Sequence, residues 1–272
     1  MTVARYWKIL FIVFIIVVLF DAFILEPYGL LISVTYVEVE ADVDKELTLI
    51  HLTDLHIHGY GFREKRVIDI VKSLKPDIIV LTGDYIESRN DLQGFKIFLS
   101  QLRKSTGNTT IIAILGNWDF ASKEVNKLLK LFKEYNVTVL RNNFKTITIK
   151  DSKLVFIGFD SIYNRYPDYT TLNKLPNGTR ILLVHEPILI PQILKREKNI
   201  TLALAGHCHG GQVKLFSWYI ILPHGCQVYR EGLYRVNSTI VYVSRGIGTT
   251  GIPARFFTPP EIVVVKLKPW NK

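Results

Sequence analysis

Short runs of apolar and β-branched residues recur along the chain, and five of them stop at a residue that can bind a metal. Examples are DIIVLTG, which stops at Asp84, and TLALAG, which stops at His207. Such runs, with helical segments between some of them, are typical of strands in a buried, largely parallel sheet. Ligands bind beyond the carboxyl ends of the strands in such sheets. We therefore expect the five end residues to gather at one edge: Asp54, Asp84, Asn117, His185 and His207.

The first three of these residues have the spacing of successive βαβ units. Strands are predicted over 47–53, 77–83 and 110–116, and helical periodicity predicts helices over 62–74, 92–102 and 123–135. Asp54 and Asp84 are 30 residues apart, and Asp84 and Asn117 are 33 apart. Because one βαβ repeat takes about 30 residues, these three residues should follow neighbouring parallel strands.

A longer strand is predicted over 30–39, at the start of the domain. From residue 137 onward, short strands dominate. We expect the later strands to form a second, mixed sheet packed on the first. They are predicted over 145–150, 153–159, 180–185, 201–205, 227–234, 239–244 and 262–267.

The first 28 residues carry a different pattern. Residues 9–25 are apolar apart from Asp21, and as a helix rising about 1.5 Å per residue they would span roughly 25 Å, slightly less than a hydrocarbon core of about 30 Å. Trp7 and Tyr28 are placed for the two membrane interfaces. The pattern predicts a retained transmembrane anchor over 1–28. A cleavable signal peptide is the alternative, but no small-x-small cleavage site follows the apolar run.

Charge indicates which side of the membrane the single remaining domain, residues 29–272, occupies. Arg5 and Lys8 precede the apolar span, and positive residues are retained on the cytoplasmic side. Chance predicts about one or two Asn-x-Ser/Thr sequons, and this chain has five, all beyond the span. They begin at Asn108, Asn136, Asn177, Asn199 and Asn237. We therefore expect a single-pass protein of the cell membrane with its globular domain on the extracytoplasmic side.

The chain of 272 residues has 34 Lys and Arg against 24 Asp and Glu, a formal net charge of +10. This excess suits an acidic partner such as a phosphate ester, a nucleic acid or an anionic lipid, although scattered basic residues also cover ordinary surfaces. No basic block with interleaved aromatic residues is present, so nucleic acid is not the favoured partner.

The two cysteines are too few for a disulfide framework. Cys208 lies between two histidines, and Cys226 follows 18 residues later. The sequence favours two free thiols and leaves a bridge between them open.

Two further histidines join the strand-end residues, because His56 and His209 each lie two residues after the first member of their group. A lone histidine or a Gly-Asp pair usually has a structural role, but the repeated placement at strand ends favours a metal site. Mixed imidazole and oxygen donors suit Mn, Fe, Zn or Co, and a carboxylate can bridge two cations about 3.5–4 Å apart. The candidate metal ligands are Asp54, His56, Asp84, Asn117, His185, His207 and His209.

These residues, within Asp54-x-His56, Gly83-Asp84, Gly116-Asn117, His185 and Gly206-His207-x-His209, occur in the order of the calcineurin-like metallophosphoesterase superfamily. The chain resembles that superfamily from about residue 47 to residue 267. The stretches 206–212, 229–234 and 243–248 are similar to its membrane-associated YkuE/YaeI branch. The resemblance implies an α/β fold, a four-layer α/β/β/α sandwich, here preceded by one transmembrane helix.

The resemblance also implies a dinuclear site. Asp54, His56 and His209 would bind one metal, Asn117, His185 and His207 would bind the other, and Asp84 would bridge them. Two divalent ions held in this way lower the pKa of a bridging water, which attacks phosphorus while the cations neutralise the phosphoryl oxygens. Asp84 and Asn117 are therefore also catalytic candidates.

The implied activity is hydrolysis of a phosphomonoester, phosphodiester or pyrophosphate. The anchor and the branch resemblance indicate a lipid-linked or envelope substrate. An alternative is a metal-binding ectodomain with attenuated catalysis that binds or senses a ligand. An extracellular nuclease would instead require salt-sensitive DNA binding. The sequence does not indicate the oligomeric state.

One position departs from the superfamily pattern, in which His usually follows the Asn ligand. Here Trp118 follows Asn117, and because an indole cannot titrate, proton donation from this position is lost. Asp119 would also lose its usual partner. Either the leaving group needs little acid help, as in pyrophosphates and aryl phosphates, or another group such as His58 replaces the acid. Both hypotheses predict weak activity on alkyl phosphodiesters.

Arg245 and Arg255 are candidates to contact substrate phosphate, because a guanidinium matches phosphate oxygens. Structural ion pairing is the alternative for both. His51 is expected to be a strand residue beneath the site, and His224 a loop residue.

Overall fold

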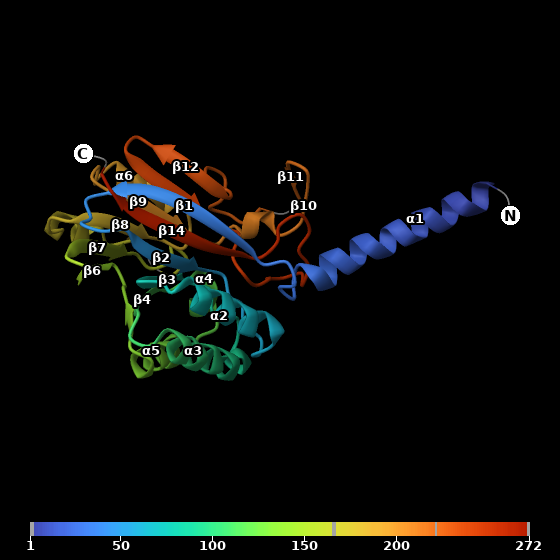
Figure 1. Cartoon of the computed structure of the whole chain (residues 1–272), viewed down its shortest axis with the longest axis horizontal. Coiled ribbons are helices and arrows are strands. Elements are labelled where there is room, and N and C mark those ends of the chain that lie inside the picture. The colour runs from blue at the N-terminus through green and yellow to red at the C-terminus, as the bar shows by residue number, and fades with distance from the viewer. Residues whose placement is uncertain (1–2, 165–166, 221, 271–272) are drawn as a thin grey trace.

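The computed structural model describes residues 3–164, 167–220 and 222–270, whose strands form two six-stranded sheets and one short hairpin (Figure 1). The first sheet has the order β1-β14-β2-β3-β4-β5. Its strands are β1 (Ser33–Ala41), β14 (Glu261–Pro269), β2 (Leu47–Leu52), β3 (Ile78–Thr82), β4 (Thr110–Ile114) and β5 (Val137–Val139). The four strands from β2 to β5 run parallel to one another.

Three helices connect these parallel strands and cover the outer face of the first sheet (Figure 1). They are α2 (Phe62–Leu74), α3 (Leu92–Thr106) and α5 (Val125–Glu134). A shorter helix, α4 (Asn117–Ala121), follows β4 directly. The sequence pattern predicts α2 over the same residues, because its apolar positions recur on one helical face.

The second sheet has the order β12-β13-β9-β8-β7-β6. Its strands are β6 (Asn143–Ile149), β7 (Ser152–Gly158), β8 (Thr179–Leu183), β9 (Leu202–Ala205), β12 (Gly232–Val236) and β13 (Thr239–Val243). Its outer face is covered by the short helix α6 (Leu189–Leu194) and by the 3-10 turn η3 (Tyr169–Lys174) with neighbouring loops. This outer layer is thinner than the helical layer on the first sheet.

The period-two alternation of side chains builds the layers. In β3, Ile79 packs with the helices, whereas Val80 packs between the sheets. In β9, Leu204 faces the inter-sheet core, whereas Ala205 packs with α6. The expected four-layer α/β/β/α sandwich is confirmed, with its main apolar core between the sheets.

The predicted sheet of the last strand is wrong. The strand expected over 262–267 was assigned to the second sheet, but β14 lies in the first sheet, parallel to β1 and antiparallel to β2. Its buried apolar pattern is the same in either position, and only tertiary pairing distinguishes them. The strand expected over 227–234 begins later, at Gly232, whose φ of 84° suits glycine.

Among the described residues, one helix is long and apolar enough to cross a membrane. This helix, α1 (Val3–Phe20), continues into a π-helical turn, η1 (Asp21–Leu25), and projects away from the sandwich (Figure 1). Its end is tied to the domain, because Thr258 donates its backbone N–H to Glu26 Oε2 at 3.0 Å. The β10–β11 hairpin, with β10 (Lys214–Leu215) and β11 (Trp218–Tyr219), lies at the same end of the domain.

Candidate metal centre

The candidate ligands follow the carboxyl ends of parallel strands from both sheets, as the sequence pattern predicts. Asp54, Asp84 and Asn117 follow β2, β3 and β4, whereas His185 and His207 follow β8 and β9. The chain turns sharply at these strand ends. Five of the seven candidate ligands have a positive φ, between 39° and 69°, and non-glycine residues rarely adopt it outside sites that require it. They are Asp54, His56, Asp84, His207 and His209.

The first group contains Asp54, His56 and His209, whose ligand atoms all lie within 4.8 Å of one another. The Nε2 atoms of His56 and His209 are 3.2 Å apart, and His209 Nε2 is 3.4 Å from Asp54 Oδ1. All three residues are buried. Their nitrogen and oxygen atoms converge on one small volume.

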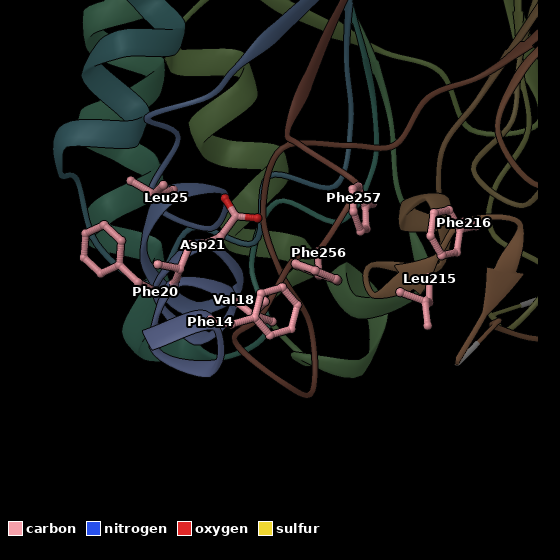
Figure 2. Close-up of a pocket in the computed structure, with 10 residues that line it drawn as sticks. Phe14, Val18, Phe20, Asp21, Leu25, Leu215, Phe216, Phe256 and Phe257 are labelled. Atoms are coloured by element: carbon pink, nitrogen blue, oxygen red, sulfur yellow. The ribbon is translucent and has the colours of Figure 1, made fainter. Parts of the chain in front are cut away.

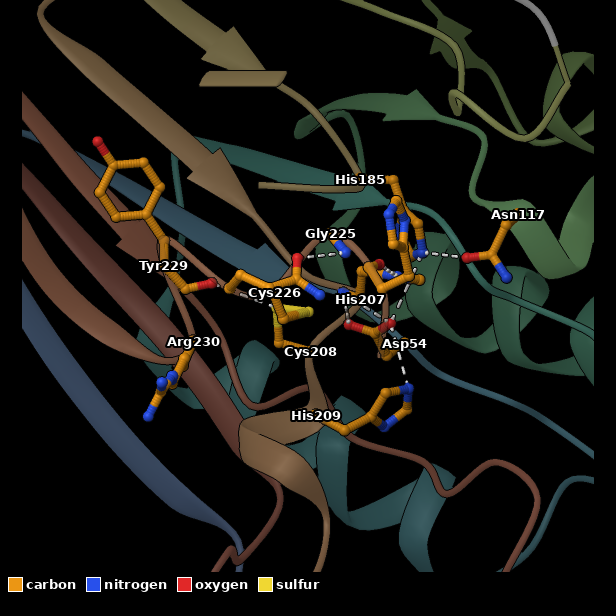
Figure 3. Close-up of a disulfide and its surroundings, with 12 residues drawn as sticks. Asp54, Asn117, His185, His207, Cys208, His209, Gly225, Cys226, Tyr229 and Arg230 are labelled. Atoms are coloured by element: carbon orange, nitrogen blue, oxygen red, sulfur yellow. Dashed lines mark hydrogen bonds and ion pairs between the residues drawn. A yellow bond between two sulfur atoms is a disulfide. The ribbon is translucent and has the colours of Figure 1, made fainter. Parts of the chain in front are cut away.

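The second group contains Asp84, His185 and His207, with ligand atoms again within 4.8 Å of one another. His185 Nε2 lies 3.1 Å from Asp84 Oδ2 and 3.0 Å from Asn117 Oδ1. Figure 3 shows the side chains of Asn117, His185 and His207 directed toward one region beside Asp54. The structure therefore brings Asn117 to the second group.

Asp84 lies between the two groups. Its Oδ2 atom is 3.1 Å from Nε2 of His185 and 3.7 Å from Nε2 of His56. One carboxylate thus faces a histidine of each group, which is the placement that a bridging ligand requires.

The remaining ring nitrogens of three histidines are held by contacts outside the cluster. His185 Nδ1 is 2.7 Å from the Thr82 carbonyl, and His207 Nε2 is 2.9 Å from the carbonyl of His224. Such contacts set the tautomer and aim the other nitrogen at the site. Two divalent cations fit this set, because imidazole and carboxylate groups converge at the centre while the outer nitrogens of His185 and His207 face carbonyl acceptors.

His56 has a carboxylate neighbour in Glu87, which the sequence analysis did not identify. Glu87 Oε1 is 2.8 Å from His56 Nδ1. The pKa of Glu87 is lowered, since the interaction with His56 outweighs the burial that alone would raise it. Glu87 lies three residues after Asp84 in a loop, and no periodic pattern marks it.

The electrostatics of the cluster reflect burial and closely spaced charges. Burial raises the pKa of Asp54 and lowers that of His209 well below its usual value. Burial alone would also lower the pKa of His185, but the carboxylates of Asp84 and Asp54 raise it well above its usual value. Asp84 keeps a lowered pKa despite burial, because of His185 and His56. The site is thus a buried, strongly polar pocket.

Two glycines are required by close approach and not by a positive φ. A Cβ atom at Gly116 would lie 2.2 Å from Asp84 Oδ1, and one at Gly206 would lie 2.4 Å from Asp54 Oδ2. Neither glycine has a positive φ. Any side chain at either position would displace a candidate ligand.

Asp119 has backbone partners in place of a histidine at position 118. Its carboxylate accepts the backbone N–H groups of Asp84 and Tyr85, both at 2.9 Å, and that of Gly116 at 2.8 Å. Burial and the neighbouring Asp84 raise the pKa of Asp119 to about 7. Asp119 therefore joins the loops that carry Asp84 and Asn117.

Trp118 lies at the edge of the centre. Its indole contacts the His56 ring edge-on, with ring centroids 6.4 Å apart. It also lines a cavity of about 570 Å³ that reaches His209. The other walls of this cavity are mainly apolar and include Val213, Ile220, Pro223 and Ile252.

Three other candidates are not among the converging ligand side chains, although Arg255 Nη2 lies 3.4 Å from His209 Nδ1. His58 is 58% exposed, and its Nδ1 atom is 3.3 Å from Asp91 Oδ1. Arg245 forms an ion pair with Glu261 at 3.0 Å. Structural ion pairing was the alternative to a contact with substrate phosphate. Arg255 is fully buried and donates to backbone carbonyls, including that of Thr258 at 2.8 Å, and burial lowers its pKa to about 9.

The expectation of two free thiols is wrong, because Cys208 and Cys226 form a disulfide (Figure 3). The bond joins the loop that carries His207 and His209 to the loop that carries His224. The two cysteines are 18 positions apart in the sequence, and the β10–β11 hairpin lies between them. As expected, His51 is a buried strand residue beneath the site and His224 is a loop residue.

Residues 47–231 match the family model of the calcineurin-like phosphoesterases. The chain is 36% identical over 229 residues to metallophosphoesterase YkuE of Bacillus subtilis (strain 168), and the alignment covers 82% of this chain and 79% of that protein. It is 32% identical over 267 residues to a metallophosphoesterase of Aquifex aeolicus (strain VF5), with 90% and 94% covered.

Two further likenesses are to a zebrafish protein and to a solved structure. A zebrafish transmembrane protein with a metallophosphoesterase domain is 29% identical over 272 residues, which cover 90% of this chain and 60% of that protein. The crystal structure of TT1561 from Thermus thermophilus matches with a TM-score of 0.52 at 11% identity, covering 74% of this chain and 90% of that one. The latter shows a shared fold alone.

Proposed function

The chain belongs to the calcineurin-like phosphoesterase family and is a metal-dependent phosphoesterase, and from that premise we propose that it hydrolyses amphiphilic, lipid-linked phosphate esters or pyrophosphates at the outer face of a cell membrane. Residues 1–28 would be the anchor and residues 29–272 the catalytic domain. The observation that carries the proposal is the convergence of seven ligand side chains beside a large apolar cavity.

The ligand geometry supports a dinuclear assignment. Asp54, His56 and His209 would hold one divalent cation, Asn117, His185 and His207 would hold the other, and Asp84 would contact both. When bound, two ions chosen from Mn, Zn, Fe or Co would activate water and neutralise the phosphoryl oxygens.

The chain's own residues position this chemistry. Asp119 fixes the backbone of both Asp84 and Gly116, and Glu87 orients the His56 ring. Trp118 lies edge-on to the His56 ring but offers no titratable proton. The proposal therefore favours leaving groups that are stable as anions, such as pyrophosphates and aryl phosphates. His58, whose ring approaches Glu87 to 4.0 Å, stays a candidate for remote proton supply.

The apolar cavity supports the amphiphilic class of substrate. It lies directly beside His209 and Trp118, and Val213, Ile220 and Ile252 contribute to its walls. At about 570 Å³ it is in the range of small-molecule sites, and its walls suit a hydrocarbon chain better than a nucleoside. A phosphate held at the metal centre could thus place its apolar group in the cavity.

Two features, α1 and the disulfide, support the proposed location of the domain outside the cytoplasm. A helix of this length and apolarity is suited to cross a bilayer. Disulfides persist mainly in oxidising compartments outside the cytoplasm, which agrees with the orientation that Arg5 and Lys8 indicate.

A substrate panel tests the proposal on the full chain in lipid nanodiscs loaded with Mn²⁺. The panel contains a lipid-linked pyrophosphate, an aryl phosphate, an alkyl phosphodiester and a soluble nucleotide. We expect kcat/KM to be highest for the lipid-linked pyrophosphate and lowest for the alkyl phosphodiester. Turnover of nucleotides with none of the lipid-linked compound would overturn the substrate class. Absence of any turnover, with the metals bound, would instead favour a binding or sensing module.

The cavity is tested separately by Ile252→Asp. Ile252 is half-exposed and lines the cavity, so a carboxylate there would face the hydrocarbon group of a bound substrate. The substitution should lower kcat/KM for the lipid-linked pyrophosphate by about tenfold or more, since opposing a charge to a hydrocarbon group costs at least about 1.4 kcal/mol. Leu233→Asp is the matched control, because Leu233 is exposed on β12 and does not line the cavity. Equal effects of the two substitutions would contradict a role for the cavity.

A further inference from the structure

We propose that the β10–β11 hairpin and the loop before β14 form a second membrane contact, which inserts into the outer leaflet beside α1. The contact surface, called here the hairpin patch, consists of Leu215, Phe216, Trp218 and Phe257. The inference rests on the proposed anchoring by α1 but not on any catalytic activity.

The hairpin patch exposes large apolar side chains at one end of the domain. Phe216 is 82% exposed and Trp218 is 81% exposed, and half of the surface of Leu215 and Phe257 is also exposed. Soluble proteins rarely leave such a group of aromatic and apolar side chains open to water. Phe216 and Phe257 come from different loops, yet their rings stack with centroids 6.3 Å apart.

The patch is continuous with the membrane helix. A pocket of about 420 Å³ is lined both by Phe14 and Val18 of α1 and by Leu215 and Phe216 of the hairpin. Figure 2 shows these side chains around the same opening, with Phe256 between the helix and the hairpin. Lipid that surrounds α1 at this level would therefore also touch the hairpin.

The chemistry of the hairpin suits the membrane interface. Residues 215–220 carry no charged side chain. Lys214, at the base of the hairpin, forms an ion pair with Glu231 on the domain side, and Arg230 lies over the Tyr219 ring at 5.2 Å. Trp and Tyr are enriched at bilayer interfaces because their rings are amphipathic. Insertion of the hairpin would thus bury aromatic area without adding an unpaired charge to the lipid. Asp21, which lines the same pocket, lies near the outer end of the apolar span, where its carboxylate can reach the headgroups.

Insertion would also orient the metal centre. Val213 and Ile220 flank the hairpin and line the apolar cavity beside His209. A hairpin held in the outer leaflet would place the opening of this cavity at the membrane surface. The anchor helix alone would leave the domain free to tilt, whereas two contacts would fix its orientation toward the bilayer.

Spin labels on the full chain in liposomes test this surface. The two natural cysteines form a disulfide, so Phe216→Cys and Trp218→Cys each introduce one free thiol at an exposed position. Ile12→Cys within α1 is the control for the bilayer, and Lys130→Cys on α5, at the far side of the helical layer, is the control for water. Collision with molecular oxygen reports lipid, and collision with a water-soluble nickel chelate reports solvent.

We expect labels at residues 216 and 218 to favour oxygen over the nickel chelate severalfold, as the label at residue 12 does, and the label at residue 130 to show the reverse. Labels at 216 and 218 that match residue 130, while residue 12 reports lipid, would overturn the proposal. Spin–spin broadening with shielding from both reagents would overturn it in favour of a second copy of the chain. If the label at residue 12 reports water, α1 does not lie in the bilayer, and both the proposed anchoring and the contact beside it are overturned.

Discussion

Trp118 donates its backbone N–H to Asp84 Oδ1 at 2.8 Å, so the residue that departs from the family pattern still holds the carboxylate between the two ligand groups. The backbone at position 118 thus serves the centre independently of the side chain. A substitution there can change proton supply without releasing Asp84.

Trp118→His should therefore raise activity on poor leaving groups. General acid catalysis contributes about 10²–10⁴-fold, and an imidazole at this position restores a titratable group. We expect kcat for an alkyl phosphodiester to rise at least about tenfold, while kcat for an aryl phosphate changes little. Trp118→Phe is the control without a titratable group. An unchanged kcat on both esters would show that position 118 does not limit proton transfer.

Glu87→Gln should weaken metal binding through His56. Removing a carboxylate that orients a ligating imidazole typically costs about 10–100-fold in metal affinity. The measurement is a titration of the metal-free protein with Mn²⁺ or Zn²⁺, followed by metal analysis, and does not depend on turnover. Glu134→Gln, on an exposed helical position, is the control. Equal affinities in the two variants would mean that Glu87 has no positioning role.

Replacing both Cys208 and Cys226 by Ser should lower the free energy of unfolding. A disulfide that closes a loop of this length restricts the unfolded chain, which raises the free energy of unfolding by about 3 kcal/mol. The same variant should bind metal less tightly, because the loop that carries His207 and His209 loses its tie. Urea unfolding of the metal-free and metal-loaded proteins separates the two effects. A loss of stability with unchanged metal affinity would limit the disulfide to a structural role.

Because of His51, the free energy of unfolding should fall as the pH is lowered into the mildly acidic range. Burial lowers its pKa from 6.5 to about 3, and its Nε2 atom is 2.7 Å from the Thr82 hydroxyl. Below pH 6.5 the unfolded chain binds a proton at this ring and the folded chain does not. The stabilisation is therefore present above pH 6.5 and is lost by about 1.4 kcal/mol per pH unit as the pH falls toward 3.

His51→Gln should flatten this dependence while keeping a partner for Thr82. The check is the urea midpoint of both proteins between about pH 7 and about pH 4.5, a window within which the unfolded histidine titrates, with the exposed His58→Gln as the control. Parallel curves for His51→Gln and the unaltered chain would show that His51 is not the titrating group.

Local patterns were enough to predict the elements that build the centre. The apolar runs and their polar ends placed Asp54, Asp84 and Asn117 after β2, β3 and β4, because buried strands and their terminal turns are encoded within a few residues. The period of α2 predicted its limits for the same reason. The apolar stretch of α1 was equally plain in the sequence.

Pairings between distant segments were decided by the tertiary structure alone. Three contacts join segments whose own sequences do not indicate a partner. They are the pairing of β14 with β2, the bond between Cys208 and Cys226, and the contact of Glu87 with His56. The position of the exposed hairpin patch next to α1 is likewise a contact between distant segments. Periodicity reports which side chains are buried, whereas packing of the whole chain determines what each buried or exposed side chain meets.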